Sequence, residues 1–401
     1  MDIYANRDNK INYVLPLIPI FLGRVQEFIP LLDKLHIAKI AMVFTLFVVF
    51  TATKNLSAAN ANNYKIPQVR YFMVITLLAI LSVPFGVWPG ASLDFLLDNH
   101  LKLTLFIYVL VWCVGSEDDI VKVFWSLILT VFAMDIACIV NPSLIDGRIY
   151  IGNTYDPNDL ALLLVISVPI LFYLIGASKG VRKVFLFTVL LTTVSMIFKT
   201  GSRGGLVALA AVAATLLYQN GFSYTVKRLP VMVALMLMAL SFTPGAQKER
   251  LQTVFQEDYN TTERGGRLEI WKRGLSVMVR NPVLGCGVGQ FVVANGKTAD
   301  GTWQAAHNSF VQIGAELGFF GLIFFTMMIF QAWKSLSRAV VGAQDTLIVP
   351  AIKASLIGLV VGSCFLSWAY SYGTYFVIAL TVIVVKIQGG IKAQDDNLDT
   401  A

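Results

Sequence analysis

A histidine and a stripe of polar residues stand where a long polar segment of the chain meets an apolar run. His307 lies in Ala-Ala-His-Asn-Ser-Phe at 305–310, and Asn308, Gln312 and Glu316 continue the stripe at four-residue spacing. A neutral imidazole accepts a proton near neutral pH, so His307 is a candidate general base. Polar residues at a membrane segment are costly and usually functional, so the other three are candidate substrate ligands. The alternative is a histidine that only caps the helix.

A first arginine lies at the start of another apolar run. Arg203 stands in Thr-Gly-Ser-Arg-Gly-Gly at 200–205. Glycine lacks a Cβ, so another group can approach this backbone closely, and a helix N-terminus with an arginine is an anion site. Lys199 adds a second charge and is a further candidate ligand. The alternative for both residues is an interfacial anchor whose charge reaches the lipid headgroups, and it is the simpler interpretation for Lys199.

Two more arginines lie close together in the polar segment. Arg264 and Arg267 stand in Thr-Glu-Arg-Gly-Gly-Arg-Leu-Glu-Ile-Trp at 262–271. A guanidinium group binds two phosphate oxygens at once, and a pair of arginines can replace a metal ion in binding a diphosphate. The alternative is a solvated helix face on which the arginines pair with Glu263 and Glu269.

Two aspartates precede a further apolar run. Asp156 and Asp159 lie in Asn-Thr-Tyr-Asp-Pro-Asn-Asp-Leu at 153–160. Three roles are open to them: binding a sugar, orienting an arginine, or capping the helix. Capping by Asn158 or Asp159 is the simplest, because these side chains accept the free amides of a first helical turn. Asp156 is a candidate substrate ligand.

The elements that must position these residues are membrane helices. The chain has 401 residues, of which 56% are hydrophobic and 14% charged, with a mean hydropathy of +0.70. This composition excludes a soluble enzyme, a secreted or disordered protein and a nucleic-acid-binding protein. About twelve apolar runs are near the length that crosses a bilayer as a helix. They cover residues 12–31, 36–53, 70–88, 101–115, 119–140, 159–177, 182–198, 204–219, 229–243, 309–332, 347–368 and 370–387.

The first of these runs is the weakest. It contains Arg24 and Glu27, whose i,i+3 spacing on a helix allows their opposite charges to pair. An interfacial or polar-lined helix is therefore an alternative for residues 12–31.

The distribution of basic residues predicts the orientation. With twelve spans both termini share a side, and the connections on that side carry more Lys and Arg than the short loops opposite, which predicts cytoplasmic termini. We therefore expect four regions: nine spans in 1–243, a periplasmic loop in 244–308, three spans in 309–388 and a cytoplasmic tail in 389–401.

The long loop is predicted to contain an amphipathic helix at 267–280. Leu268, Trp271, Leu275 and Met278 recur at helical spacing, and Asn281-Pro282 ends the pattern. The following glycines at 285, 287 and 289 lack the strand and helix of a phosphate-binding loop, so we predict a turn. No His/Cys cluster has metal-ligand spacing, and we expect no cofactor.

The order of these motifs resembles that of the bacterial O-antigen ligase and polymerase superfamily. The matching parts are Gly-Ser-Arg-Gly-Gly at 201–205, Gly-Gly-Arg-Leu-Glu-Ile-Trp at 265–271, Asn-Pro-Val-Leu-Gly-Cys-Gly at 281–287, His-Asn-Ser-Phe at 307–310 and Glu-Leu-Gly at 316–318. Asn-Asp-Leu-Ala at 158–161 is similar too. The resemblance is specific within residues 150–330. It implies an all-α polytopic membrane protein with about twelve transmembrane helices and a large periplasmic loop, resembling C-type glycosyltransferases.

The resemblance implies a glycosyltransferase at the periplasmic face of the bacterial inner membrane. Its donor is a glycan on undecaprenyl diphosphate. The acceptor of a ligase is the lipid A core oligosaccharide, and that of a polymerase is another lipid-linked repeat unit; the moderate loop favours a ligase. The family's two arginines and one histidine carry over onto Arg203, Arg267 and His307 as catalytic residues, whereas Arg264 is added from charge alone. The implied reaction is an inverting single displacement without ATP or metal.

A transporter of lipid-linked glycans is the alternative from another class, since polar residues inside helices are also expected there. Against it, the chain has no inverted repeat, and its polar candidates gather near one membrane surface. The expected partners are the lipid-linked donor, the acceptor and membrane lipids, with no nucleic acid.

Overall fold

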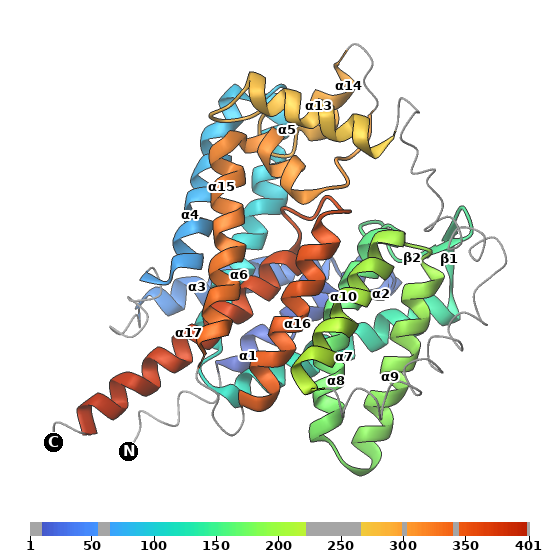
Figure 1. Cartoon of the computed structure of the whole chain (residues 1–401), viewed down its shortest axis with the longest axis vertical. Helices are drawn as coiled ribbons and strands as arrows, with labels where there is room; N and C mark the ends of the chain where they lie inside the picture. Colours follow the sequence, from blue (N-terminus) through green and yellow to red (C-terminus); the bar gives the residue numbers. More distant parts are fainter. Residues whose placement is uncertain (1–9, 55–64, 222–265, 299–302, 340–344, 399–401) are drawn as a thin grey trace.

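The chain is an all-α membrane protein, and the part that the structure describes also contains a small β-hairpin. The computed structural model describes residues 10–54, 65–221, 266–298, 303–339 and 345–398 (Figure 1). Its helices are α1 Ile11–Val14, α2 Pro30–Lys34, α3 Ile37–Lys54, α4 Pro67–Ser82, α5 Pro89–Phe95, α6 Leu101–Cys113, α7 Glu117–Val140, α8 Pro157–Ala177, α9 Gly180–Lys199, α10 Arg203–Asn220, α13 Arg267–Arg280, α14 Phe291–Gly296, α15 Ser309–Arg338, α16 Asp345–Ser363 and α17 Tyr372–Leu398. The strands β1 Ser143–Ile145 and β2 Arg148–Tyr150 pair antiparallel.

Most of the predicted spans are present as helices. Within the described residues, seven helical stretches are long and apolar enough to cross a membrane, and shorter apolar helices cover Ile11–Leu22, Ile37–Phe47 and Leu347–Ser363. The predicted span at 204–219 is α10. The predicted span at 229–243 lies outside the described residues. The helix α17 continues past residue 388 to Leu398, so the predicted tail begins inside a helix.

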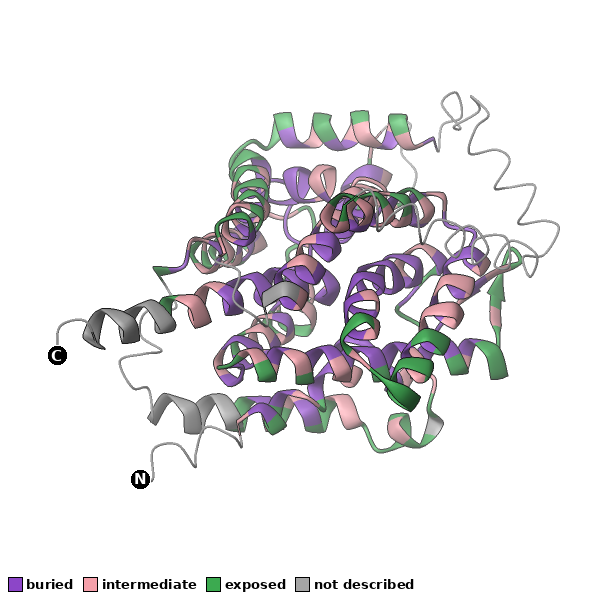
Figure 2. Cartoon of the chain, turned by 60° about the horizontal axis from the view of Figure 1, so that its bottom comes forward, coloured by how far each residue is buried: buried purple, intermediate pink, exposed green. Residues whose placement is uncertain are grey.

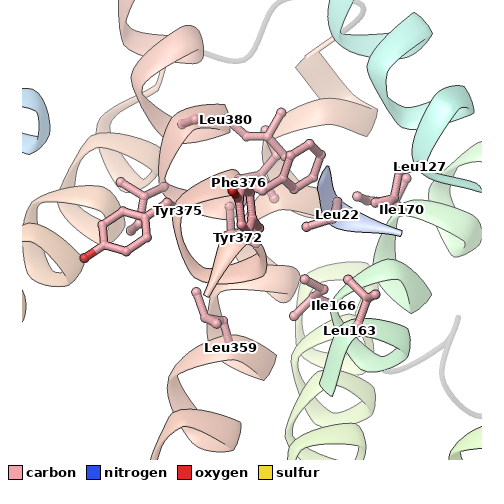
Figure 3. Packing of buried hydrophobic residues seen from close by; sticks show 14 of the residues in the cluster. Leu22, Leu127, Leu163, Ile166, Ile170, Leu359, Tyr372, Tyr375, Phe376 and Leu380 are labelled. Atoms are coloured by element: carbon pink, nitrogen blue, oxygen red, sulfur yellow. The ribbon is translucent and has the colours of Figure 1, made fainter. Parts of the chain in front are cut away.

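The first predicted span is not one continuous helix. The stretch expected at 12–31 consists of α1, a π-helical turn at Ile18–Leu22, a 3₁₀ turn at Val25–Glu27 and the start of α2. The break falls at Arg24, whose φ of 52° is left-handed and cannot continue a helix. Leu22 nevertheless lies in the core, and Figure 3 shows it among side chains of α8 and α17.

The helix α8 is the most enclosed of the bundle. Nearly all its residues from Leu160 to Leu171 are buried, while the outward faces of peripheral helices are exposed (Figure 2). α16 packs against it through Gly358 and Gly362, four residues apart. A Cβ on Gly362 would lie 2.3 Å from Leu162 Cδ1, so the two helices approach at a distance that only glycine allows.

Two helices lie across one end of the bundle. Figure 1 shows α13 and α14 at the end opposite to α1 and to the last turns of α17. α13 has the bounds that were predicted for the amphipathic helix, and it ends before Asn281-Pro282 as expected. The three glycines that follow, Gly285, Gly287 and Gly289, all have positive φ, which confirms the predicted turn.

The last two spans are separated by more chain than predicted. Hydropathy placed their boundary near Ala369, but α16 ends at Ser363 and α17 begins at Tyr372. Residues 364–371 form a connecting segment, hereafter the 364–371 loop. Its apolar members Leu366, Trp368 and Ala369 are buried, and for that reason the segment resembles a helix in hydropathy.

Candidate active site

His307 lies in the turn before α15, and its main chain is held from two sides. Its φ of 48° is left-handed, a conformation uncommon for residues with a Cβ but several-fold enriched for His. Its amide donates to Ser367 Oγ over 2.9 Å. The next residue, Asn308, caps α15 by accepting the amides of Phe310 and Val311 at 2.9 and 3.1 Å. Backbone strain that neighbouring contacts maintain is typical of functional sites.

The charges around His307 favour its neutral form. Burial lowers the pKa of the imidazole, the positive charges of Arg267 and Arg148 lower it further, and the negative charge of Asp156 acts in the opposite direction. The imidazole is therefore neutral at pH 7 and has a nitrogen free of a proton. A neutral imidazole is the form that acts as a general base.

Arg267 is the first residue of α13, and this helix is fixed close to His307. The indole Nε1 of Trp271, one turn along α13, donates to the carbonyl of Ala306 over 2.9 Å. Gly274 lets α13 approach α15, because a Cβ there would lie 2.5 Å from Val311 Cγ1. The structure thus brings together two of the predicted catalytic residues, Arg267 and His307.

The buried face of α13 agrees only in part with the predicted apolar stripe. Met278 is buried as predicted, together with Ile270 and Gly274, whereas the predicted Leu268 and Leu275 are 45% and 47% exposed. The sequence pattern missed this face because its central residue is a glycine, whose lack of a side chain permits the contact.

Arg203 begins α10, and its surroundings match the predicted close approach. Ser202 caps the helix by accepting the amide of Gly205 over 3.1 Å. A Cβ on Gly204 would lie 2.6 Å from Phe365 Cβ, so the start of α10 packs directly on the 364–371 loop that also holds His307. Lys199 is the last residue of α9, four positions before Arg203.

Arg148 is a functional candidate that the sequence analysis missed. It follows the two-residue turn Asp146-Gly147, in which both residues have positive φ, as a type I′ hairpin requires. Its Nε donates to the Thr200 carbonyl over 2.8 Å and its Nη2 to Asn158 Oδ1 over 2.7 Å. The Asp-Gly pair was the signal for this hairpin, but the partners at residues 158 and 200 have no local signature.

The start of α8 contributes two aspartates. The predicted cap, Asn158 or Asp159, is wrong: Asp156 caps α8, and its Oδ1 accepts the amides of Asn158 and Asp159 at 2.6 and 2.8 Å. Asp159 Oδ1 instead accepts the indole Nε1 of Trp368 over 2.7 Å. The 364–371 loop is therefore tied to α8 as well as to His307.

Gln312 and Glu316 face loops rather than open space. Glu316 is fully buried, and its two oxygens accept the amides of Gly289 and Phe291 at 2.9 and 3.0 Å. Gln312 Oε1 accepts the amide of Ala369 at 3.3 Å. These contacts favour positioning roles, in which the two side chains hold the segments behind His307.

The remaining predictions concern Arg264 and a metal site. Arg264 lies outside the described residues. Among the residues that the structure describes, no group of three His, Cys, Asp or Glu side chains could hold a metal ion. The chemistry of the cluster follows from His307 and its charged neighbours: a neutral base can take a proton from a hydroxyl, and guanidinium groups can stabilise a developing anion.

Comparison with known proteins shows a similarity within this region. A family model described as O-Antigen ligase matches residues 186–326, a segment that includes Arg203, Arg267 and His307. A search of curated proteins finds no match. The family match confirms the resemblance to the O-antigen ligase and polymerase superfamily without separating its two activities.

Proposed function

We propose that this protein, in which residues 186–326 match the O-antigen ligase family, is an O-antigen ligase. It transfers a glycan from undecaprenyl diphosphate to a hydroxyl of the lipid A core oligosaccharide. The observation that carries the proposal is the position of His307, whose turn is bound by Trp271 of α13 and by Ser367. The charges of Arg267, Arg148 and Asp156 all act on its imidazole. This combination fits a reaction in which a hydroxyl attacks and an anion leaves.

The acceptor step depends on His307. A sugar hydroxyl is a poor nucleophile, so it gains from a base that removes its proton as the oxygen attacks the anomeric carbon. The imidazolium that results is a cation, and the negative charge of Asp156 stabilises it. Asp156 therefore acts on the base and needs no contact with the sugar.

The donor step depends on the arginines. As the bond between the anomeric carbon and the diphosphate oxygen breaks, negative charge develops on the leaving undecaprenyl diphosphate. Arg203, Arg267 and Arg264 neutralise this charge. Because diphosphate is a good leaving group, this electrostatic stabilisation in a water-poor site is sufficient for it to leave. A single displacement inverts the anomeric configuration, and the energy comes from the lipid diphosphate bond, without ATP or metal.

The membrane placement belongs to the same proposal. The protein lies in the bacterial inner membrane with cytoplasmic termini, and the cluster around His307 faces the periplasm. Figure 1 supports this arrangement, because α13 lies at the end opposite to α1 and the last turns of α17. The donor reaches the site from the surrounding lipid.

A polymerase that joins lipid-linked repeat units is the second candidate, because the family match covers both activities. A transporter is a weaker candidate, because the charged residues form a cluster at the ends of α8, α10, α13 and α15 and not at the bundle centre.

A reconstituted transfer assay tests the proposal. Purified protein is incubated with undecaprenyl-diphosphate glycan and lipid A core, with a chelator and without nucleotide. We expect glycan on the lipid A core with wild-type protein, and transfer by His307→Asn slower by about 10²-fold or more. Elongation of the lipid-linked glycan alone would identify a polymerase, and no product of either kind would contradict both enzymatic functions.

A further inference from the structure

Arg24 has a strained backbone at a position that the proposed mechanism does not use. It follows the apolar stretch Ile11–Leu22, and its φ of 52° is left-handed. Arginine has no special preference for this conformation, which costs on the order of 1 kcal/mol or more in a residue with a Cβ. The surrounding structure therefore holds Arg24 in a backbone conformation of higher free energy, as is common at binding sites.

The guanidinium of Arg24 is poorly satisfied by its neighbours. Its ion pair with Glu27 is long, at 3.7 Å. The Glu27 carboxylate already accepts the amides of Asn153 and Thr154 at 2.7 and 2.9 Å, as well as the Thr154 hydroxyl. The Nε of Arg24 is buried and has no hydrogen-bond partner within the described part of the chain. The group thus keeps most of its capacity to bind an anion.

A tyrosine ring orients this guanidinium. The Arg24 Cζ lies 5.4 Å from the centre of the Tyr372 ring at the start of α17. A cation over an aromatic face is attracted to the ring while its N–H groups remain free at the edges. The side chain is 26% exposed, so a ligand can still reach it.

Arg24 is near the cluster around His307. Its charge and that of Asp159 both act on the hydroxyl of Tyr155, which is buried and donates to the Leu22 carbonyl. Asp159 in turn binds Trp368 of the 364–371 loop. A group bound at Arg24 would therefore lie beside the start of α8.

An apolar groove leads to the same position from the membrane. The residue after Arg24, Val25, lines a groove of about 510 Å³ together with Leu15 and Pro19 on one wall. The other wall is α7, with Trp125, Leu129 and Ala133 among its lining residues. Lys122 also lines this wall, and its charge is paired with Asp119 over 3.1 Å. Both walls belong to apolar segments within the bilayer, where a hydrocarbon chain is the natural occupant.

We propose that Arg24 binds a phosphate group of a polyprenyl-phosphate lipid whose chain lies in this groove. The inference rests on the proposed function, since it assigns the donor's path to the site. Arg24 directly precedes Val25 of the groove lining. A positive charge next to an apolar groove complements a lipid that combines an anionic head with a long hydrocarbon chain. The guanidinium fork matches two phosphate oxygens.

Lipid binding to the purified protein tests the proposal without any transfer reaction. The probes are undecaprenyl diphosphate and inorganic diphosphate, and the variants are Arg24→Ala, Arg24→Lys and Ala133→Trp, which fills the groove. The controls are Arg182→Ala, which removes an exposed arginine from α9, and Ile136→Trp, which adds the same ring on an exposed face of α7. Thermal unfolding of each variant excludes loss of the fold.

We expect Arg24→Ala to weaken binding of undecaprenyl diphosphate about tenfold or more, the scale for losing a desolvated charge contact, and Arg24→Lys to restore part of it. Ala133→Trp should weaken binding of the lipid and leave inorganic diphosphate unaffected. Both controls should bind as wild type does.

The inference and the proposed function fail in different ways. If folded Arg24→Ala binds the lipid as wild type does, the inference is overturned, even where the variant raises the KM for the acceptor. Unchanged lipid binding by Ala133→Trp would overturn the assignment of the groove. If the wild type binds the lipid through Arg24 but transfers no glycan, the inference stands and the proposed function fails.

Discussion

The main-chain amide of His307 donates a hydrogen bond to the Ser367 hydroxyl over 2.9 Å, across 60 residues of sequence. The contact ties the proposed base to the 364–371 loop, which also touches the starts of α8 and α10 through Trp368 and Phe365. One short loop thus sets the distances among residues that come from three distant parts of the chain.

Ser367→Ala removes this contact and leaves the His307 side chain intact. We expect about a tenfold loss of transfer activity with a loss of about 1 kcal/mol in unfolding free energy, as for a single hydrogen bond. The control is Ser371→Ala in the same loop, whose hydroxyl accepts the amide of Gly373 instead. Transfer rates equal in the two variants would show that Ser367 does not position the base.

His307→Asn removes the imidazole base but keeps the left-handed backbone conformation of the turn. Asparagine adopts the left-handed conformation of His307 readily, so the turn before α15 should persist. We expect transfer to fall by about 10²-fold or more, the contribution of a general base, with an unchanged thermal unfolding midpoint. Normal transfer by this variant would remove His307 from the mechanism.

Asp156→Asn should shift the pH profile of transfer. Asparagine is as good a helix cap as aspartate, so α8 keeps its first turn. The negative charge of Asp156 raises the pKa of His307, so its loss lowers that pKa further. Activity requires the neutral imidazole and is lost as pH falls through its pKa, so the acid limb of kcat/KM should move to lower pH.

The control for this titration is Asp98→Asn, which removes an exposed carboxylate that pairs with Lys102 and is not among the charges that shift the pKa of His307. Its profile should superimpose on that of the wild type. An acid limb that moves to higher pH in Asp156→Asn would contradict the proposed role of Asp156.

Gly274→Ala tests the docking of α13. The added methyl group would meet Val311 at 2.5 Å and Phe291 at 2.9 Å, so the helix must move away from α15. We expect a loss of about 1–3 kcal/mol in unfolding free energy, typical of overpacking, and reduced transfer because Arg267 moves with the helix. Gly176→Ala in α8 is the control, since its methyl group meets no described atom within 4 Å. Equal transfer by both variants would show that the position of α13 does not matter.

The sequence predicted the helices well where hydropathy and stop signals agree. α13 has its predicted bounds because Asn281-Pro282 ends an amphipathic pattern, and α7 to α10 follow from apolar runs bounded by polar turns. Hydropathy missed the 364–371 loop, because buried loop residues such as Leu366 and Trp368 are as apolar as helical ones. Hydropathy also missed the break in the first predicted span at Arg24, because the break depends on the left-handed backbone conformation of this one residue.

The sequence predicted the main residues of the candidate site but not the residues that hold them in position. Arg267 and His307 were both found from sequence, and the structure places the charge of Arg267 where it acts on the imidazole of His307. Arg148 and Ser367 were missed, since their partners lie 10 to 60 residues away and no local pattern encodes such contacts.

The helix α15 is broken at Gly318, which separates the end next to His307 from the long apolar portion of the helix. Gly318 has a φ of 71°, and the amide of Phe319 donates to the Pro282 carbonyl over 2.8 Å instead of continuing the helix. Residues 309–317 are also anchored to the segment after α13, because the amide of Cys286 donates a hydrogen bond to the carbonyl of Ala315 over 2.8 Å. Helices tilt to match local bilayer thickness. We expect the portion of α15 beyond Phe319 to tilt as the bilayer thins or thickens, while the anchored residues keep His307 in register with Arg267.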